Sequence, residues 1–233
     1  MRRVAVYAGT RNVYKNMVTA AKSLLIHTRV DRVIFLTEDD TFPEWIPPVI
    51  ECLNISGMAG DWFNTEGPNY NCRWTYMTLI RLALPEIITE EDRVLWLDID
   101  TIVNHDIGEL FDMDLRGNLV AMAEEPSRSK NPFVYHNAGV LLMDLEHLRD
   151  NGLYLDMIDL VNRQHLGAPD QDAINLLCQT RILDISPVWN ASGWTGMPVD
   201  PYIRHYAAER DYTAQPLWKC YEKREWEGPS CQC

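Results

Sequence analysis

The first forty residues alternate between apolar and polar segments in a way that constrains the fold. Val4–Tyr7 is an apolar run typical of a buried strand, and 32–37 is a second one. Between them, apolar residues recur at helical spacing: Val13, Met17, Ala20, Ala21, Leu24 and Leu25. A strand, a helix and a strand within about thirty residues form a βαβ unit. The chain should therefore build parallel strands into an α/β sheet.

A later apolar segment contains two acidic residues that are separated by one position. Residues 93–103 read RVLWLDIDTIV, and a strand would place Asp98 and Asp100 on one face. Two close like charges resist burial unless something positive lies beside them. A hard divalent cation with oxygen ligands is the natural partner. The pair therefore suggests a metal that holds phosphates, although short acidic pairs are also common without a metal.

The remaining segments predict more elements of the same kind. Strands are expected at 49–53, 119–123 and 139–143, and helices at 72–84, 154–162 and 171–178. A turn-rich segment at 57–71 suggests a mobile surface loop with aromatic anchors, and the order after Leu183 is irregular. Because no repeat or linker divides the chain, a single domain is the expectation.

The composition of the chain argues against some classes of binding partner. The chain has 233 residues, of which 46% are hydrophobic and 24% charged, as in a globular domain. Its formal net charge of −13 argues against nucleic acid or an anionic membrane as the main partner. No run reaches the roughly 18 apolar residues of a membrane span, so we expect no stable membrane insertion. Scattered cysteines without framework spacing favour free thiols and a cytoplasmic location. The oligomeric state is open, with a homodimer as one option.

Three later segments complete a pattern that resembles glycosyltransferase family 8, which includes glycogenin and bacterial lipopolysaccharide galactosyltransferases. They are HNAGVLLM at 136–143, PDQDAIN at 169–175, and His205-Tyr206 followed by QPLWK at 215–219. Their order and spacing match the family from about residue 3 to residue 219. Each motif is weak alone, but together they cover almost the whole chain.

The resemblance implies a GT-A fold, in which one Rossmann-like, mostly parallel sheet is flanked by helices. An irregular C-terminal segment would serve the acceptor and the metal. The domain would cover residues 1–219, with a nucleotide-binding half at about 1–105 and a sugar and acceptor half at about 106–219. Residues 220–233 would form a tail.

The implied activity is that of a retaining glycosyltransferase, which moves a hexose from a UDP-sugar to a hydroxyl of a carbohydrate or other acceptor. Mn²⁺ would be the cofactor, with Mg²⁺ as the alternative. Its expected ligands are Asp98, Asp100 and His205. Without the resemblance, a half-buried strand position would be the favoured interpretation of His205.

The resemblance also assigns the donor site. Tyr14 could stack on the base or pack on its helix, and Arg81 could reach the pyrophosphate or decorate its helix face. The residues expected at the nucleotide are Ala8, Thr10, Asn12, Tyr14, Arg81, Asp98 and Ile99. The sugar would be held by Asn137, Gly139, Asp170 and Gln171, of which Asn137, Asp170 and Gln171 carry the catalytic expectation. Asp170 could also cap its helix, and Glu124 loosely matches another acidic sugar contact.

A neutral amide such as Gln171 is a poor nucleophile, which favours attack on the same face from which UDP leaves. The acceptor site is expected among loops, with 57–71 and 189–202 as candidates.

The sequence departs from the family in its late segment. Ala208 replaces the usual glycine, and Gln215 replaces a lysine that would face the pyrophosphate. Lys219 or Arg210 could substitute if the loop follows a different path, and the sequence leaves this open. The loss of the lysine keeps open a catalytically degenerate sugar-nucleotide-binding protein. A sugar-phosphate nucleotidyltransferase is the other, less favoured alternative. Such an enzyme needs a glycine-rich basic first loop, and residues 8–11 of this chain, AGTR, are a poor version of one.

Overall fold

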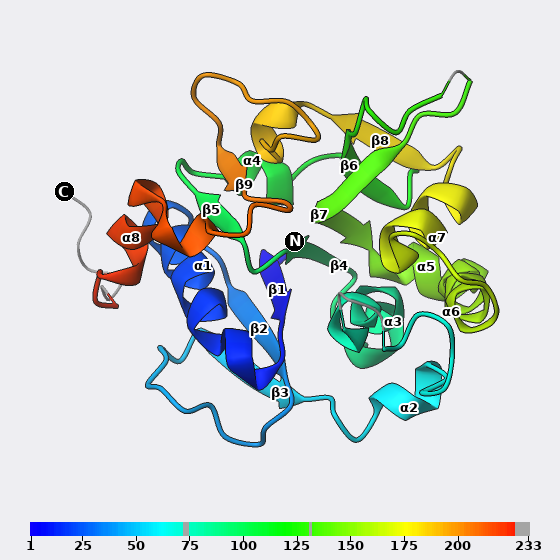
Figure 1. Cartoon of the computed structure of the whole chain (residues 1–233), viewed down its shortest axis with the longest axis horizontal. Helices are drawn as coiled ribbons and strands as arrows, with labels where there is room; N and C mark the ends of the chain where they lie inside the picture. The colour runs from blue at the N-terminus through cyan, green and yellow to red at the C-terminus, as the bar shows by residue number, and fades with distance from the viewer. Residues whose placement is uncertain (72–74, 131, 227–233) are drawn as a thin grey trace.

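A computed structural model describes residues 1–71, 75–130 and 132–226. Within this part of the chain, seven strands form a central sheet in the order β3-β2-β1-β4-β7-β6-β8 (Figure 1). Their bounds are β1 Val4–Ala8, β2 Arg32–Thr37, β3 Ile50–Asn54, β4 Arg93–Leu97, β6 Val120–Glu124, β7 His136–Asp144 and β8 Ile182–Ile185. The expected α/β class is confirmed.

One strand of the seven runs in the opposite direction to the others. Strands β1, β2, β3 and β4 run parallel, as the βαβ unit predicts, and β6 runs parallel to β8. Strand β7 is antiparallel to both of its neighbours, β4 and β6. The sheet is therefore mostly parallel, with β7 as the exception in the middle.

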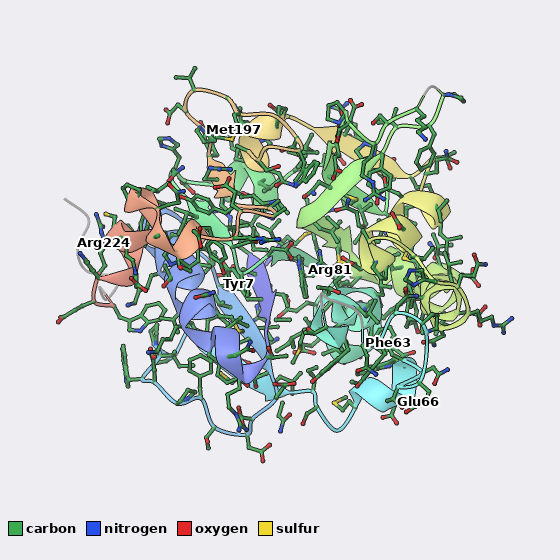
Figure 2. All side chains as sticks on the ribbon, viewed as in Figure 1. Tyr7, Phe63, Glu66, Arg81, Met197 and Arg224 are labelled. Atoms are coloured by element: carbon green, nitrogen blue, oxygen red, sulfur yellow. The ribbon has the colours of Figure 1, made fainter. Side chains whose placement is uncertain are left out.

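Both faces of the sheet are covered, because alternate residues of each strand point to opposite sides. Val4 and Val6 of β1 join the core beneath α3, α5, α6 and α7. Ala5 and Tyr7 join the second core beneath α1. The helices that cover the sheet are α1 Tyr14–His27, α3 Ile80–Ile87, α5 Leu145–Asn151, α6 Leu153–Arg163 and α7 Pro169–Leu177. Figure 2 shows Tyr7 and Arg81 well inside the molecule, with Glu66 near its edge.

The acidic segment does not form the single strand that its composition suggests. Strand β4 ends at Leu97, and Thr101–Val103 forms β5, which belongs to a separate two-stranded sheet with β9 Ile203–His205. Between them the chain turns, and the Thr101 hydroxyl donates to the Asp98 carbonyl at 2.7 Å. The two aspartates therefore lie in a turn between two sheets and not on one strand.

The second predicted helix also differs. Residues 72–74 lie outside the described residues, and Thr75 has a left-handed φ of 64°, which interrupts a helix. A 3-10 turn follows at Tyr76–Thr78, and α3 continues past Pro85 to Ile87. Helices α6 and α7 agree with the predicted segments to within two residues, whereas α5 and the short α4 Gly108–Phe111 lack a strong periodic signal.

The segment at 57–71 contains a short helix and a buried side chain. It contains the short helix α2 Ala59–Trp62, and Phe63 is fully buried. The Asn69 amide donates to the Val161 carbonyl of α6 at 2.6 Å. These contacts hold the segment against α6, so it is more firmly anchored than a surface loop.

The last described helix is α8 Pro216–Glu222, which runs through the expected boundary at 219/220. Trp218 and Tyr221 are buried, and the Tyr221 hydroxyl lies 2.7 Å from His27 Nε2 of α1. Cys52, Cys178 and Cys220 are free thiols, while the other three cysteines lie outside the described residues. Among the described residues, no helix has the length and apolar character that a membrane span requires.

Candidate active site

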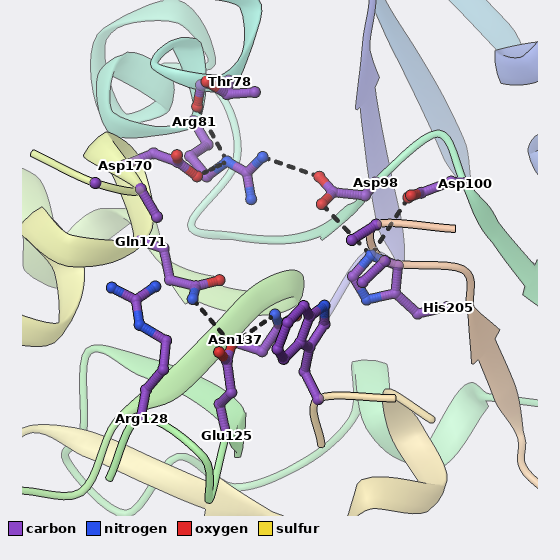
Figure 3. Close-up of a pocket in the computed structure, with 15 residues that line it drawn as sticks. Thr78, Arg81, Asp98, Asp100, Glu125, Arg128, Asn137, Asp170, Gln171 and His205 are labelled. Atoms are coloured by element: carbon purple, nitrogen blue, oxygen red, sulfur yellow. Dashed lines mark hydrogen bonds and ion pairs between the residues drawn. The ribbon is translucent and has the colours of Figure 1, made fainter. Parts of the chain in front are cut away.

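A cavity of about 450 Å³ opens where the end of β4, the start of β7, α3, α7 and β9 meet (Figure 3). It brings together seven of the residues expected from the sequence. Its lining is Thr78, Arg81, Asp98, Asp100, Glu125, Arg128, Asn137, Gly167, Ala168, Asp170, Gln171, Trp194, His205, Ala207 and Ala208.

Three of these residues have the donor set of a metal site. Ligand atoms of Asp98, Asp100 and His205 all lie within 4.8 Å of one another. His205 Nε2 is 3.3 Å from Asp100 Oδ1 and 3.8 Å from Asp98 Oδ2. Two carboxylates and an imidazole suit Mn²⁺, which accepts oxygen and nitrogen ligands. The residues therefore fit the divalent cation that the sequence predicts.

The pairing of β5 with β9 brings His205 to the aspartates. Thr101 pairs with His205 in this register, and the Tyr206 amide donates to the Asp100 carbonyl at 2.9 Å. Asn190 Oδ1 lies 2.8 Å from His205 Nδ1, which turns Nε2 toward the carboxylates. Such outer contacts set the orientation of metal-binding histidines.

Electrostatics couple His205 to Asp100. Burial alone would lower the pKa of the His205 imidazole, but the Asp100 and Asp98 carboxylates together outweigh burial and raise that pKa. In return, burial would raise the pKa of Asp100, and the imidazole instead lowers it. Each group thus favours the charged form of the other.

Gly139 lies directly beneath the His205 ring. A Cβ atom at this position would lie 2.0 Å from His205 Cε1 and 2.6 Å from Nδ1. The sequence suggests that this glycine admits a sugar close to the backbone. In the structure, the group that needs the space is His205 of the metal cluster.

Arg81 connects the metal cluster to the opposite wall. Its guanidinium donates to Asp98 Oδ1 at 2.9 Å and to the Ala138 carbonyl at 2.6 Å, and its Nε lies 3.0 Å from Asp170 Oδ2. The guanidinium also lies 4.4 Å from the centre of the Trp96 ring. Arg81 is only 3% exposed, so it points into the site and does not decorate the helix face.

Asp170 begins the first turn of α7 and is nearly fully buried. Burial raises the pKa of this carboxyl, and the charge of Arg81 opposes that rise. The N-cap of α7 is Ala168, and no side chain of the described residues makes a cap hydrogen bond there, so the interpretation of Asp170 as a cap is wrong. Its carboxyl instead lines the cavity.

The Gln171 amide is fixed at both ends. Its oxygen accepts from the Ala138 amide at 2.9 Å, and its nitrogen donates to Glu125 Oε2 at 3.1 Å. The same Glu125 oxygen accepts from the Asn137 amide at 3.2 Å. Glu125 thus holds both amide side chains, and Figure 3 shows the three converging.

The sequence loosely matches Glu124 to an acidic sugar contact, but the glutamate that lines the cavity is its neighbour Glu125. Glu124 is the last residue of β6 and pairs with His136 of β7. Glu125 lies just past the end of β6, in which Val120–Ala123 are all buried. Because burial does not alternate along this strand, no local period in the sequence distinguishes Glu125 from Glu124.

Arg128 forms the wall beyond Gln171. Its guanidinium donates to Asp172 Oδ1 at 2.8 Å and lies 4.0 Å from the centre of the Tyr135 ring. Tyr135 also donates to Asp172. Arg128, Thr78 and Trp194 have no local motif in the sequence, because only tertiary packing places them at the cavity.

Five residues expected at the nucleotide lie outside the cavity lining: Ala8, Thr10, Asn12 and Tyr14 near the first turn, and Ile99 between β4 and β5. The Tyr14 ring is buried 4.9 Å from the Phe42 ring, centre to centre. Its hydroxyl accepts from the Glu38 amide at 2.8 Å and donates to Asp39 at 3.0 Å. The expected free stacking surface is therefore covered, because α1 packs this ring against the segment after β2.

The late lysine is not replaced in the lining of the cavity. Lys219 lies on α8, where it pairs with Glu222 at 2.5 Å, and neither it nor Arg210 lines the cavity. Among the described residues, the lining contains two arginines, Arg81 and Arg128, and no lysine. The expected substitution by Lys219 or Arg210 is thus not supported by the structure.

Ala208 adopts the left-handed backbone conformation, with a φ of 62°. This conformation explains why glycine suits the position, because a Cβ there costs about 1–2 kcal/mol. We expect Ala208→Gly to raise the free energy of unfolding by about 0.5–1 kcal/mol, since lost strain exceeds the added unfolded-state entropy. Urea unfolding measures it. The neighbouring Ala207→Gly should lower stability, and equal effects would contradict the argument.

Comparison with known proteins agrees with this geometry. A family model described as glycosyl transferase family 8 matches residues 6–212. Glycosyltransferase GlyE of Streptococcus pneumoniae serotype 4 is 29% identical over 200 residues, which cover 81% of this chain and 48% of GlyE. GlyF of the same organism is 27% identical over 204 residues, covering 82% of this chain and 49% of GlyF. The chain thus spans about half the length of these curated relatives.

Solved structures share the fold. The crystal structure of Streptococcus pneumoniae GlyE has a TM-score of 0.71 at 23% identity and covers 97% of this chain and 61% of its own. The galactosyltransferase LgtC, crystallised with donor and acceptor sugar analogs, has a TM-score of 0.72 at 20% identity and covers 94% and 95%. Their folds confirm the GT-A architecture. Since the family model covers most of the residues, the chain belongs to glycosyltransferase family 8.

Proposed function

We propose that this protein is a Mn²⁺-dependent retaining glycosyltransferase that moves a hexose from a UDP-sugar to a hydroxyl acceptor. The observation that carries the proposal is the convergence of Asp98, Asp100 and His205 at one end of a cavity whose other wall carries Asp170 and Gln171. Family membership and the galactosyltransferase and glycosyltransferase relatives support the same chemistry.

Each residue would have a separate part in the reaction. Asp98, Asp100 and His205 would hold the cation, which when bound neutralises charge on the leaving diphosphate. Arg81 would keep the Asp98 carboxylate in place and add positive charge near the phosphates. Asp170 and Asn137 would accept and donate hydrogen bonds to hexose hydroxyls.

The fixed Gln171 amide supports attack from the same face as the leaving group. Both ends of the amide are engaged by protein groups, and a neutral amide is a weak nucleophile. The anomeric carbon–oxygen bond to UDP would break, and a bond to the acceptor oxygen would form on that face. The acceptor proton would pass to the departing UDP oxygen. The product would then keep the anomeric configuration of the donor.

Calorimetric titration of UDP with and without Mn²⁺ tests the proposal. We expect binding that requires Mn²⁺ and weakens at least 100-fold in Asp100→Asn, because the substitution removes a charged metal ligand. The exposed Asp156→Asn is the matched control and should bind like the unmodified protein.

Turnover then separates the alternatives. Proton NMR of the products formed from UDP-glucose and UDP-galactose should show a retained anomer. An inverted anomer would contradict the retaining reaction. Metal-dependent UDP binding without release of sugar from either donor would instead indicate a sugar-nucleotide-binding protein.

A further inference from the structure

One side chain of the cavity lining differs from the rest. Trp194 is 44% exposed, whereas most of the polar groups around the cavity are buried. A single exposed apolar side chain is ordinary on a protein surface, but an accessible aromatic ring in the lining of a cavity is typical of a ligand contact. The hydrogen bonds of the donor and metal residues do not involve this indole.

The backbone that carries Trp194 is held rigidly. Ser192 and Gly196 exchange two backbone hydrogen bonds of 3.1 and 3.0 Å across the turn. The buried Ser192 and Thr195 hydroxyls lie 3.0 Å apart, and the Thr195 hydroxyl donates to the Asn190 carbonyl. Trp194 therefore lies in a tight turn that is stabilised by several hydrogen bonds.

The same turn is connected to the chemical groups through Asn190. This fully buried side chain lies 2.8 Å from His205 Nδ1 and donates to Asn137 Oδ1 at 3.0 Å. Its backbone carbonyl anchors Thr195, one residue beyond the tryptophan. The position of Trp194 is thus set relative to both the metal cluster and the sugar-binding amides.

The cavity lining offers two kinds of surface. Asp170, Asn137 and Glu125 are 7%, 6% and 4% exposed, so they form a buried polar surface that suits the hydroxyls of the donor hexose. Trp194 adds a flat, apolar and solvent-accessible surface. An acceptor arrives from solvent and must bring only one hydroxyl into the cavity.

We propose that Trp194 is the acceptor platform and that the acceptor is a pyranoside whose apolar C–H face stacks on the indole. A pyranose ring carries hydroxyls around its edge and C–H groups on a face, which complements an aromatic ring beside polar groups. A serine-peptide or acyclic hydroxyl acceptor has no such face. This inference rests on the proposed function and specifies the acceptor class of the same site.

Transfer to methyl pyranosides tests the platform. UDP release from UDP-glucose and UDP-galactose with Mn²⁺ is measured in water and with methyl glucoside, galactoside or N-acetylglucosaminide. We expect at least one glycoside to be glycosylated, and the ratio of transfer to hydrolysis to fall at least tenfold in Trp194→Ala. Trp194→Phe should recover most of the ratio, because a phenyl ring still stacks. The fully exposed Val199→Ala on the same loop is the control.

A binding measurement does not depend on turnover. In protein labelled with 5-fluorotryptophan, the ¹⁹F resonance that disappears in Trp194→Phe is that of Trp194. With UDP and diamagnetic Mg²⁺ present, methyl glycosides should shift this resonance, and glycerol should not. No shift, an unchanged transfer ratio in Trp194→Ala, or transfer only to serine peptides would overturn the platform. Absence of any donor turnover together with a shifted resonance would fault the proposed function alone.

Discussion

Gly139→Ala should abolish metal-dependent UDP binding. The new methyl group would meet His205 Cε1 at 2.0 Å, so one of the two groups must move. The imidazole has little room, because it is 3% exposed and held by Asn190. Overpacking of this kind costs about 1–3 kcal/mol of stability, and displacing a metal ligand should weaken Mn²⁺-dependent binding by at least 100-fold. Calorimetry with UDP and Mn²⁺ measures the effect.

Two further variants separate the steric cause from a general loss of folding. Gly57→Ala has no atom within 4 Å of its added Cβ and should behave like the unmodified protein. Combining Gly139→Ala with His205→Ala removes the clash and should restore thermal stability, but not metal binding. If Gly139→Ala binds UDP and Mn²⁺ normally, the inferred packing of His205 on Gly139 is wrong.

Arg81→Met should lower the free energy of unfolding by about 3–5 kcal/mol, which is the usual cost of removing one partner from a buried ion pair. The methionine leaves Asp98 and Asp170 without their guanidinium and leaves the Ala138 carbonyl without a donor. Arg81→Lys should recover only part of the loss, because an ammonium cannot reach three acceptors in a fixed plane. Denaturant unfolding measures both variants.

The pH dependence of the Arg81→Met loss distinguishes charge from packing. Burial raises the pKa of Asp170 in the folded protein, and removing Arg81 takes away the charge that opposes this rise. The folded variant then binds a proton more readily than the unfolded chain, so its stability should recover as pH falls. Arg81→Met combined with Asp170→Asn should remove that recovery. A loss that is independent of pH would instead indicate a packing defect.

The sequence predicts correctly those elements whose pattern of side chains lies within a short segment. The apolar periods of β1, α1 and β2 predict a βαβ unit, because side-chain spacing alone distinguishes a strand from a helix over short distances. The acidic pair after β4 and the late histidine predict a hard-metal site from ligand chemistry and family resemblance. The structure brings these three side chains together.

Other parts depend on contacts between distant segments. The segment at 93–103 is mostly apolar around its aspartates, yet it divides between two sheets because β5 pairs with β9. The Tyr14 ring is suited to stacking in the sequence, but its burial against Phe42 takes that surface away. Neither outcome has a local signal in the sequence.

The sequence by itself determined the α/β class, the family, the acidic pair and the Asp170–Gln171 segment, because these follow from local periodicity and motif order. Tertiary structure decided which groups share the cavity. Glu125 and Trp194 reach it from loops that follow β6 and precede β9, and His205 reaches the aspartates through strand pairing. Gly139 is needed by the His205 ring packed upon it. Such contacts join residues far apart in the chain, and no periodicity within either segment encodes them.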